Sequence, residues 1–151
     1  MRAHWVHVEH DFTSPVDRVF AELSEHENLG TVLGAKVERI RDGDADRNGV
    51  GSCRRLRAGP LPPFEETVTA FVPDELIEYR ITKGSPMRDH VGVMRFSSLP
   101  GGGSHLDYRI RLSTPVPGLA LAVKSGLTQN IAKGLSGVDA RVAASTAAAS
   151  G

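Results

Sequence analysis

The sequence predicts a single α+β domain in which a curved antiparallel sheet of six to seven strands wraps around a long C-terminal helix. Apolar and polar side chains alternate through most of residues 36–112, which is typical of strands joined by short turns. Residues 119–142 instead place an apolar side chain at every third or fourth position, as a helix with one buried stripe does. The apolar sheet face and the helix stripe can cover each other if the sheet curves, and this arrangement leaves space for a cavity between them.

The N-terminal part is predicted to form one strand and two short helices. Residues 4–12 alternate as a half-buried strand does, and a helix over residues 16–25 follows the N-cap residue Ser14. A second helix over residues 27–33 ends at Gly34, because glycine readily adopts the left-handed conformation found at helix C-termini.

Six further strands are predicted, and glycine, proline and aspartate cluster in the turns between them. These strands cover residues 36–41, 51–57, 64–72, 76–82, 90–99 and 105–112. The last strand alternates most strictly, with one apolar face formed by Leu106, Tyr108, Ile110 and Leu112. The strand before it is less regular, and its pattern leaves open which face points inward.

The C-terminal helix is predicted as one unbroken element. Its apolar stripe consists of Leu119, Val123, Leu127, Ile131, Leu135, Val138 and Val142. Three glycines lie within it, at positions 126, 134 and 137, and they permit a bend or a close approach to the sheet. The sequence therefore predicts one domain over residues 1–144, with a flexible tail of small and polar residues at 145–151.

The composition excludes several classes of function. Lysine plus arginine and aspartate plus glutamate both number 18, so no excess of positive charge indicates nucleic-acid binding. The sequence has no apolar run of about 18 residues, so no membrane span is expected. The N-terminus lacks an apolar signal segment, and we therefore expect a cytoplasmic protein. The many arginine, alanine and glycine residues indicate a bacterial origin. Monomer and homodimer both remain open.

No motif for a metal or cofactor is found in the sequence. The single cysteine, Cys53, permits no intramolecular disulfide and no cysteine-rich zinc site, and its alternating surroundings indicate a small core residue. The acidic turn at residues 42–49 is similar to a calcium loop, but no glutamate closes it. The cluster of Arg54, Arg55 and Arg57 is interpreted as the solvated face of a strand. Neither a metal nor a cofactor is therefore expected.

Four stretches carry a resemblance to a known superfamily. They are FTSPVDRVF at residues 12–20, GVGS at 49–52, ETV, PD and YRI within 66–81, and GGS and DY within 102–108. These stretches resemble the helix-grip (SRPBCC or START-like) superfamily, which includes the birch-pollen allergen (Bet v 1-like) type, START lipid-transfer domains and bacterial polyketide cyclase/dehydrase-like proteins. Members commonly carry a tryptophan near the end of the second short helix, whereas the only tryptophan here is Trp5.

The resemblance implies a pocket for a hydrophobic or amphipathic small molecule, lined by the inward faces of the strands and the long helix. The expected ligand-binding residues are Tyr79, Ile81, Met94, Phe96, Tyr108, Ile110, Leu112, Val123, Leu127 and Ile131. Among these, a tyrosine can orient a carbonyl or hydroxyl group of the ligand through its phenol.

Tyr108, Tyr79 and His90 are the candidate catalytic residues, since an imidazole can exchange a proton near neutral pH. Each has a structural alternative, namely a core tyrosine with a satisfied hydroxyl group or a histidine at the surface. His10 has the same ambiguity. The acidic candidates are Glu65, Glu66 and Asp89, and the default interpretation of each is a solvated residue at a strand edge.

Three functions are compatible with these features. The first is the binding or transport of a lipid, a polyketide or a similar apolar molecule. The second is a cyclase or dehydratase that folds a reactive chain in the cavity, and the third is a protein-interaction module. Because few polar groups are predicted to face the pocket, the sequence favours the first.

Overall fold

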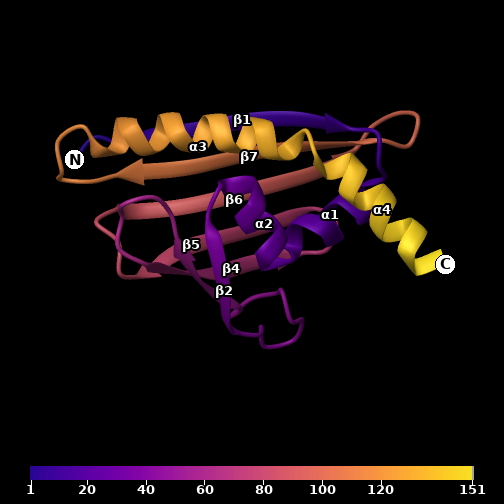
Figure 1. The fold of residues 1–151 in the computed structure, drawn as a ribbon, viewed down its shortest axis with the longest axis horizontal. Helices are drawn as coiled ribbons and strands as arrows, with labels where there is room; N and C mark the ends of the chain where they lie inside the picture. Colours follow the sequence, from indigo (N-terminus) through magenta and orange to yellow (C-terminus); the bar gives the residue numbers. More distant parts are fainter. Residues whose placement is uncertain (151) are drawn as a thin grey trace.

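In the computed structural model, which describes residues 1–150, the chain forms one antiparallel sheet with helices packed against its inner face (Figure 1). Seven strands are present in these residues, in the order β1-β7-β6-β5-β4-β3-β2. They are β1 (His4–Phe12), β2 (Lys36–Arg41), β3 (Cys53–Arg57), β4 (Phe64–Val72), β5 (Leu76–Lys83), β6 (Arg88–Ser98) and β7 (Ser104–Ser113). The predicted α+β fold with a seven-stranded antiparallel sheet is confirmed.

The helices are α1 (Val16–Ser24), α2 (His26–Leu33), α3 (Leu119–Leu135) and α4 (Val138–Ser150). The long helix α3 lies along β1 and also contacts β7 and α2 (Figure 1). The short helix α1 contacts β6 and β7. Within the part of the chain that the structure describes, no helix is both long enough and apolar enough to cross a bilayer.

The C-terminal helix is broken, and the prediction of one unbroken helix is wrong at this point. The helix α3 ends at Leu135, and α4 begins at Val138 after a change of direction at Ser136 and Gly137 (Figure 1). The turn directs α4 toward α1, where the Asp139 carboxylate accepts hydrogen bonds from the backbone and hydroxyl group of Ser14. Ser14 therefore ties α4 to the start of α1 and does not cap α1 with its side chain.

The expected flexible tail overlaps α4. The helix continues through residue 150, while Gly151 and the side chains of residues 146–150 lie outside the described part of the chain. The domain limit at residue 144 and the mobility of the tail stay predictions.

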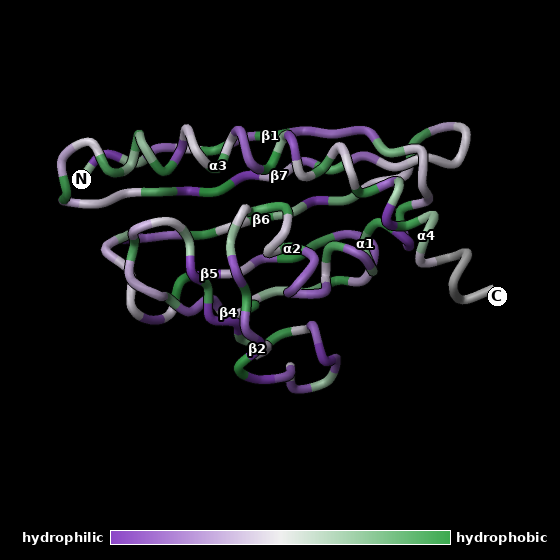
Figure 2. Tube along the Cα trace, in the orientation of Figure 1, coloured by the Kyte–Doolittle hydropathy of each residue, from purple (hydrophilic) through white to green (hydrophobic). Residues whose placement is uncertain are grey.

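Alternation along the strands separates the two faces of the sheet, and Figure 2 shows hydrophobic and hydrophilic residues alternating along them. On β7, the predicted apolar face is buried throughout. On β6, His90, Met94 and Phe96 point inward and are buried, whereas Val91 and Val93 are only half-buried. The sequence leaves open which face of this strand points inward, and the structure shows that it is the face with His90, Met94 and Phe96.

One end of the inner sheet face is filled by aromatic packing beneath α1. The ring of Phe20 on α1 lies 5.2 Å from the ring of Phe71 and 5.0 Å from the ring of Phe96, measured between centroids. Such tilted and edge-to-face contacts pack a core efficiently. The cavity described below therefore lies nearer the other end of α3.

A buried histidine holds α2 against the loop between β2 and β3. The hydroxyl group of Ser52 donates to the carbonyl oxygen of Gly49 at 2.7 Å, so it accepts from Nε2–H of His26 at 3.1 Å. Burial lowers the pKa of His26 to about 3, and the positive charges of Arg54 and Arg39 add to this effect. His26 is therefore a neutral, structural residue.

Candidate functional site

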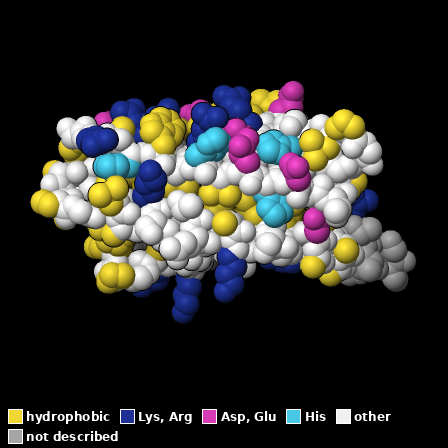
Figure 3. All heavy atoms as spheres, turned by 90° about the horizontal axis from the view of Figure 1, so that it is seen from above, with side chains coloured by type: hydrophobic (Ala, Val, Ile, Leu, Met, Phe, Trp, Pro, Cys, Tyr) yellow, Lys and Arg dark blue, Asp and Glu magenta, His cyan; other side chains and the backbone are white. Residues whose placement is uncertain are grey.

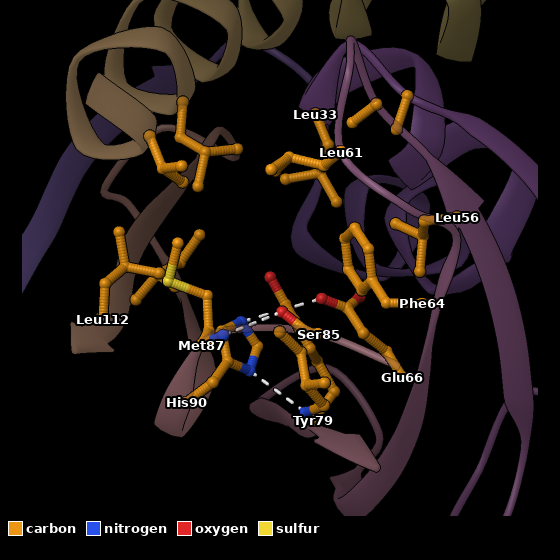
Figure 4. Close-up of a pocket in the computed structure, with 16 residues that line it drawn as sticks. Leu33, Leu56, Leu61, Phe64, Glu66, Tyr79, Ser85, Met87, His90 and Leu112 are labelled. Atoms are coloured by element: carbon orange, nitrogen blue, oxygen red, sulfur yellow. Dashed lines mark hydrogen bonds and ion pairs between the residues drawn. The ribbon is translucent and has the colours of Figure 1, made fainter. Parts of the chain in front are cut away.

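A cavity of about 70 Å³ lies between α3 and the inner face of the sheet (Figure 4). Its apolar lining consists of Leu33, Ala35, Leu56, Ala58, Leu61, Phe64, Ile81, Met87, Ile110, Leu112, Val123 and Leu127. Its polar lining consists of Glu66, Tyr79, Ser85 and His90. The cavity is thus an apolar chamber with polar groups gathered at one end.

The structure divides the ligand-binding residues that the sequence predicts into two groups. Those that line the cavity are Tyr79, Ile81, Ile110, Leu112, Val123 and Leu127. Those that lie outside its lining, in the packed core, are Met94, Phe96, Tyr108 and Ile131. The second group is buried by its neighbours; Phe96, for example, packs directly on Phe20 of α1.

The polar end of the cavity is built around a buried ion pair. Arg54 on β3 and Glu66 on β4 face each other in the register of the sheet and are only 2% and 4% exposed. Both Nε and Nη2 of Arg54 approach Oε1 of Glu66, at 2.9 and 2.8 Å. Although burial opposes the charge of Arg54, the Glu66 carboxylate raises the pKa of Arg54 above its ordinary value. The predictions that Arg54 and Glu66 are solvated are therefore wrong.

His90 lies beside this ion pair, and the surface alternative for His90 is wrong. Its Nδ1 accepts a hydrogen bond from the backbone N–H of Ile81 at 3.1 Å, which leaves the proton of the neutral ring on Nε2. Nε2 lies 3.6 Å from Oε2 of Glu66, and Figure 4 marks this contact with a dashed line. Burial lowers the pKa of His90 despite the opposing effect of Glu66. His90 is therefore a neutral hydrogen-bond donor at the cavity wall.

Two tyrosines complete the cluster behind the cavity. The hydroxyl groups of Tyr79 and Tyr108 form a hydrogen bond, and the guanidinium carbon of Arg54 lies 4.6 Å from the centre of the Tyr79 ring. Burial raises the pKa of both phenols. Because the two hydroxyl groups are paired with each other, both residues fit the structural alternative of a core tyrosine, although Tyr79 also lines the cavity.

The other candidates lie outside the cavity lining. His10 is half-buried on β1 beside Phe12, Glu65 pairs with Arg55 at 3.1 Å, and Asp89 is exposed. Within the described lining, only Glu66 and His90 offer metal-binding side chains, and Arg54 already occupies one oxygen of Glu66. Two such ligands fall short of the three that catalytic zinc sites use, so the chamber fits a small molecule better than a metal.

A surface groove of about 330 Å³ adjoins the cavity, between α3 and the loop that connects β3 to β4. The groove and the cavity share the lining residues Leu33, Ala58, Leu61, Val123 and Leu127. Figure 4 shows Leu33 and Leu61 at the end of the cavity opposite His90. A movement of this loop would therefore join the two spaces.

The sequence predicts only part of the polar cluster formed by Arg54, Glu66 and His90. Glu66 and His90 were among the candidates, but Arg54 was not, because a run of arginines in a strand resembles a solvated face. The signal that could have found it is the pairing of two adjacent strands that each place a charge at an inward position.

The comparisons with known proteins agree with this architecture. A family model described as polyketide cyclase/dehydrase and lipid transport matches residues 3–143. No curated protein matches the chain by sequence.

Solved structures share the fold at low sequence identity. A protein from Thermus thermophilus has a TM-score of 0.74 and 17% identity, over 94% of this chain and 99% of its own. A norcoclaurine synthase from Thalictrum flavum has a TM-score of 0.70 and 14% identity, over 96% of this chain and 97% of its own. The Zhui aromatase/cyclase from Streptomyces has a TM-score of 0.66 and 17% identity, over 93% of this chain and 92% of its own.

These identities establish the shared fold alone, but the family model covers nearly the whole chain. Together with the sheet, the long helix and the cavity between them, it confirms the helix-grip assignment made from the sequence. The chain belongs to the polyketide cyclase/dehydrase and lipid transport family.

Proposed function

We propose that this protein binds an apolar small molecule that carries a hydroxyl or enol group at one end. The observation that carries the proposal is the apolar chamber whose polar end holds His90 and Glu66, the latter already paired with Arg54. The ion pair is internally balanced and His90 is neutral, so the chamber favours a neutral ligand over a charged one.

The spacing of the two polar groups indicates the kind of ligand group that fits. Nε2–H of His90 and Oε2 of Glu66 are 3.6 Å apart, which is too long for a good hydrogen bond between them. A ligand hydroxyl can accept from His90 and donate to Glu66 at once. A carbonyl or ether oxygen can accept from His90 but cannot satisfy Glu66, so a hydroxyl-bearing ligand should bind more tightly.

Binding requires the chamber to widen. Its volume of about 70 Å³ is well below the roughly 300–1,000 Å³ of drug-sized ligand sites. The adjoining groove of about 330 Å³ supplies the missing space if Leu61 and its loop move outward. We therefore expect an elongated ligand, with its polar end at His90 and its apolar part between Leu61 and α3.

A matched pair of probes tests this function, namely 1-naphthol and 1-methoxynaphthalene, which differ in the hydrogen-bond donor. Calorimetry should show 1-naphthol binding about tenfold more tightly, equivalent to about 1.4 kcal/mol. Native mass spectrometry of the purified protein should in addition reveal a copurifying apolar molecule. Equal affinity for both probes would contradict the proposed role of Glu66. The absence of binding to either probe would contradict the proposed function.

A second candidate function is a cyclase or dehydratase acting on such a ligand. It is favoured by the Glu66 carboxylate, which could accept a proton, beside the Nε2–H of His90, which could hold a carbonyl oxygen. The test is ring closure of a linear polyketone followed by mass spectrometry. Loss of turnover in Glu66→Gln, with the probe still bound, supports the enzyme; binding without turnover in the wild type supports the carrier.

The location and assembly of the protein belong to the proposal as well. We expect a cytoplasmic protein of bacterial origin that is monomeric or homodimeric. Size-exclusion chromatography with light scattering measures the assembly directly.

A further inference from the structure

The outer face of the sheet, on the side opposite the cavity, carries a second cluster of chemically active side chains. In the register of β1 and β7, Glu9 lies opposite Asp107, and His7 lies one outward position further along β1. Figure 3 views the side of the molecule on which β1 lies and shows histidine and acidic side chains gathered along one band. The cluster is independent of the proposed ligand cavity.

Three of these side chains bring donor atoms together. Nε2 of His7 lies 3.3 Å from Oδ1 of Asp107 and 3.9 Å from Oε2 of Glu9, and the donor atoms of all three residues lie within 4.8 Å of one another. Ligand atoms held about 2.0–2.2 Å from a tetrahedral zinc ion are roughly 3.3–3.6 Å apart. Small side-chain rotations would therefore place the three donors around one ion.

Neighbouring side chains hold the carboxylate of Glu9 in place. The second oxygen of Glu9, Oε1, lies 3.2 Å from Nε2 of His105, and Nδ1 of His105 lies 2.5 Å from Oδ1 of Asp11. Chains of carboxylate and imidazole groups of this kind commonly orient metal ligands from behind. All these residues lie on paired strands, so their backbone positions are set by the sheet.

Arg109 balances the negative charge at this position. Its Nε lies 3.0 Å from Oδ1 of Asp107, and its Nη2 lies 3.3 Å from Oδ2. A cation that binds Oδ1 must displace this guanidinium, whose side chain is 55% exposed and can turn into solvent. Arg109 is thus a built-in competitor, and its removal distinguishes a metal site from a surface network of ion pairs.

We propose that His7, Glu9 and Asp107 form a surface site for a divalent transition-metal ion, with Zn²⁺ as its best occupant and water at the open position. One imidazole and two carboxylates are a ligand set that suits Zn²⁺ and leaves a coordination position free. The sequence predicted no metal because the donors come from two strands that lie about 100 residues apart in the chain, and no short motif contains all three.

Titration of the full chain with ZnCl₂ by calorimetry tests the site. We expect one Zn²⁺ per chain and a loss of affinity of at least about tenfold in His7→Gln and in Asp107→Asn. Arg109→Ala should bind Zn²⁺ more tightly than the wild type. His4→Gln, which removes a histidine of the same strand outside the cluster, should leave the affinity unchanged.

A spectroscopic measurement reports position as well as affinity. Trp5 is the only tryptophan of the chain and lies on the outer face of β1 next to His7, with 47% of its surface exposed. Cu²⁺, which quenches nearby tryptophan, should reduce its fluorescence in the wild type and in His4→Gln but much less in His7→Gln. Equal zinc affinity in the wild type, His7→Gln and Asp107→Asn, or weaker binding in Arg109→Ala, would overturn the proposal.

Discussion

The Nε2 atom of His90 lies 3.6 Å from Oε2 of Glu66, at the polar end of an otherwise apolar cavity. The other side of each group is already engaged, since Ile81 N–H donates to His90 and Arg54 holds the other oxygen of Glu66. The two atoms that face each other are therefore a donor and an acceptor with fixed positions. The buried ion pair, which stabilises the fold, therefore also positions the acceptor atom of the proposed ligand site.

Breaking the buried ion pair should destabilise the protein strongly. Glu66→Ala leaves the charge of Arg54 buried without a partner, so we expect the free energy of unfolding to fall by about 3–5 kcal/mol. Urea denaturation measures this change. The double variant Arg54→Met with Glu66→Leu removes both charges and should recover most of the loss.

The neighbouring ion pair provides a matched control on the same two strands. Glu65 pairs with Arg55 at 3.1 Å but lies closer to solvent, so Glu65→Ala should cost less than about 1 kcal/mol. If Glu66→Ala and Glu65→Ala have similar small effects, Glu66 is not a buried partner of Arg54 in solution.

Filling the cavity should abolish ligand binding and leave the fold intact. Leu127 lines the cavity from α3, and a Leu127→Trp side chain would occupy the space available to a ligand. Leu121→Trp places the same side chain on an exposed position of the same helix. Calorimetry with 1-naphthol should detect binding in Leu121→Trp and not in Leu127→Trp; equal binding in the two variants would place the ligand elsewhere.

Stability should fall in acid because of His26. The folded protein holds the pKa of His26 at about 3, below the ordinary value of 6.5, so between these values the unfolded chain binds the proton more readily. The contribution of neutral His26 to the free energy of unfolding is therefore complete above pH 6.5 and is lost as the pH falls from 6.5 to 3. It amounts to about 4–5 kcal/mol at most.

Urea denaturation at several pH values in this range measures the slope. His26→Gln should show lower stability at pH 7 and a flatter decline in acid than the wild type. The lowered pKa of His90 acts in the same direction in both proteins, so the difference between them isolates His26. If the free energy of unfolding of the wild type and of His26→Gln fell in parallel with pH, protonation of His26 would not destabilise the fold.

Two glycines of α3 should respond to alanine in opposite ways. A Cβ atom at Gly134 would lie 2.7 Å from the Cα atom of Val32 on α2, whereas one at Gly126 would meet nothing within 4 Å. Gly126→Ala should raise the melting temperature, because alanine favours the helix by up to about 1 kcal/mol. Gly134→Ala should lower it; a rise in both variants would contradict the close approach of α3 to α2.

The fold could be predicted from the sequence because its signals are local. Strict alternation in the last strand and helical spacing after residue 119 are properties of consecutive residues, and each indicates its element without knowledge of the rest. The break between α3 and α4 was hidden, since the apolar spacing of the stripe continues through Val138 and Val142 while the backbone turns at Gly137.

The cavity could be predicted only in outline because its position depends on what fills the remaining space. The alternating pattern correctly predicts that Phe96 points inward. Only the packing of Phe20 on Phe96 shows that this end of the sheet is filled by side chains and leaves no room for a ligand. The burial of Arg54 likewise depends on the register that places it opposite Glu66. Such relationships join distant segments and leave no pattern within either one.

The imidazole ¹⁵N NMR spectrum of His90, recorded during titration with 1-naphthol, tests directly whether the polar end of the cavity receives the ligand. We expect a neutral ring protonated at Nε2, whose signals shift on binding of 1-naphthol and shift less with 1-methoxynaphthalene. His90→Phe assigns the signals. If saturating 1-naphthol leaves the His90 signals unchanged, the polar end of the cavity does not receive the ligand, and the proposed binding site is contradicted.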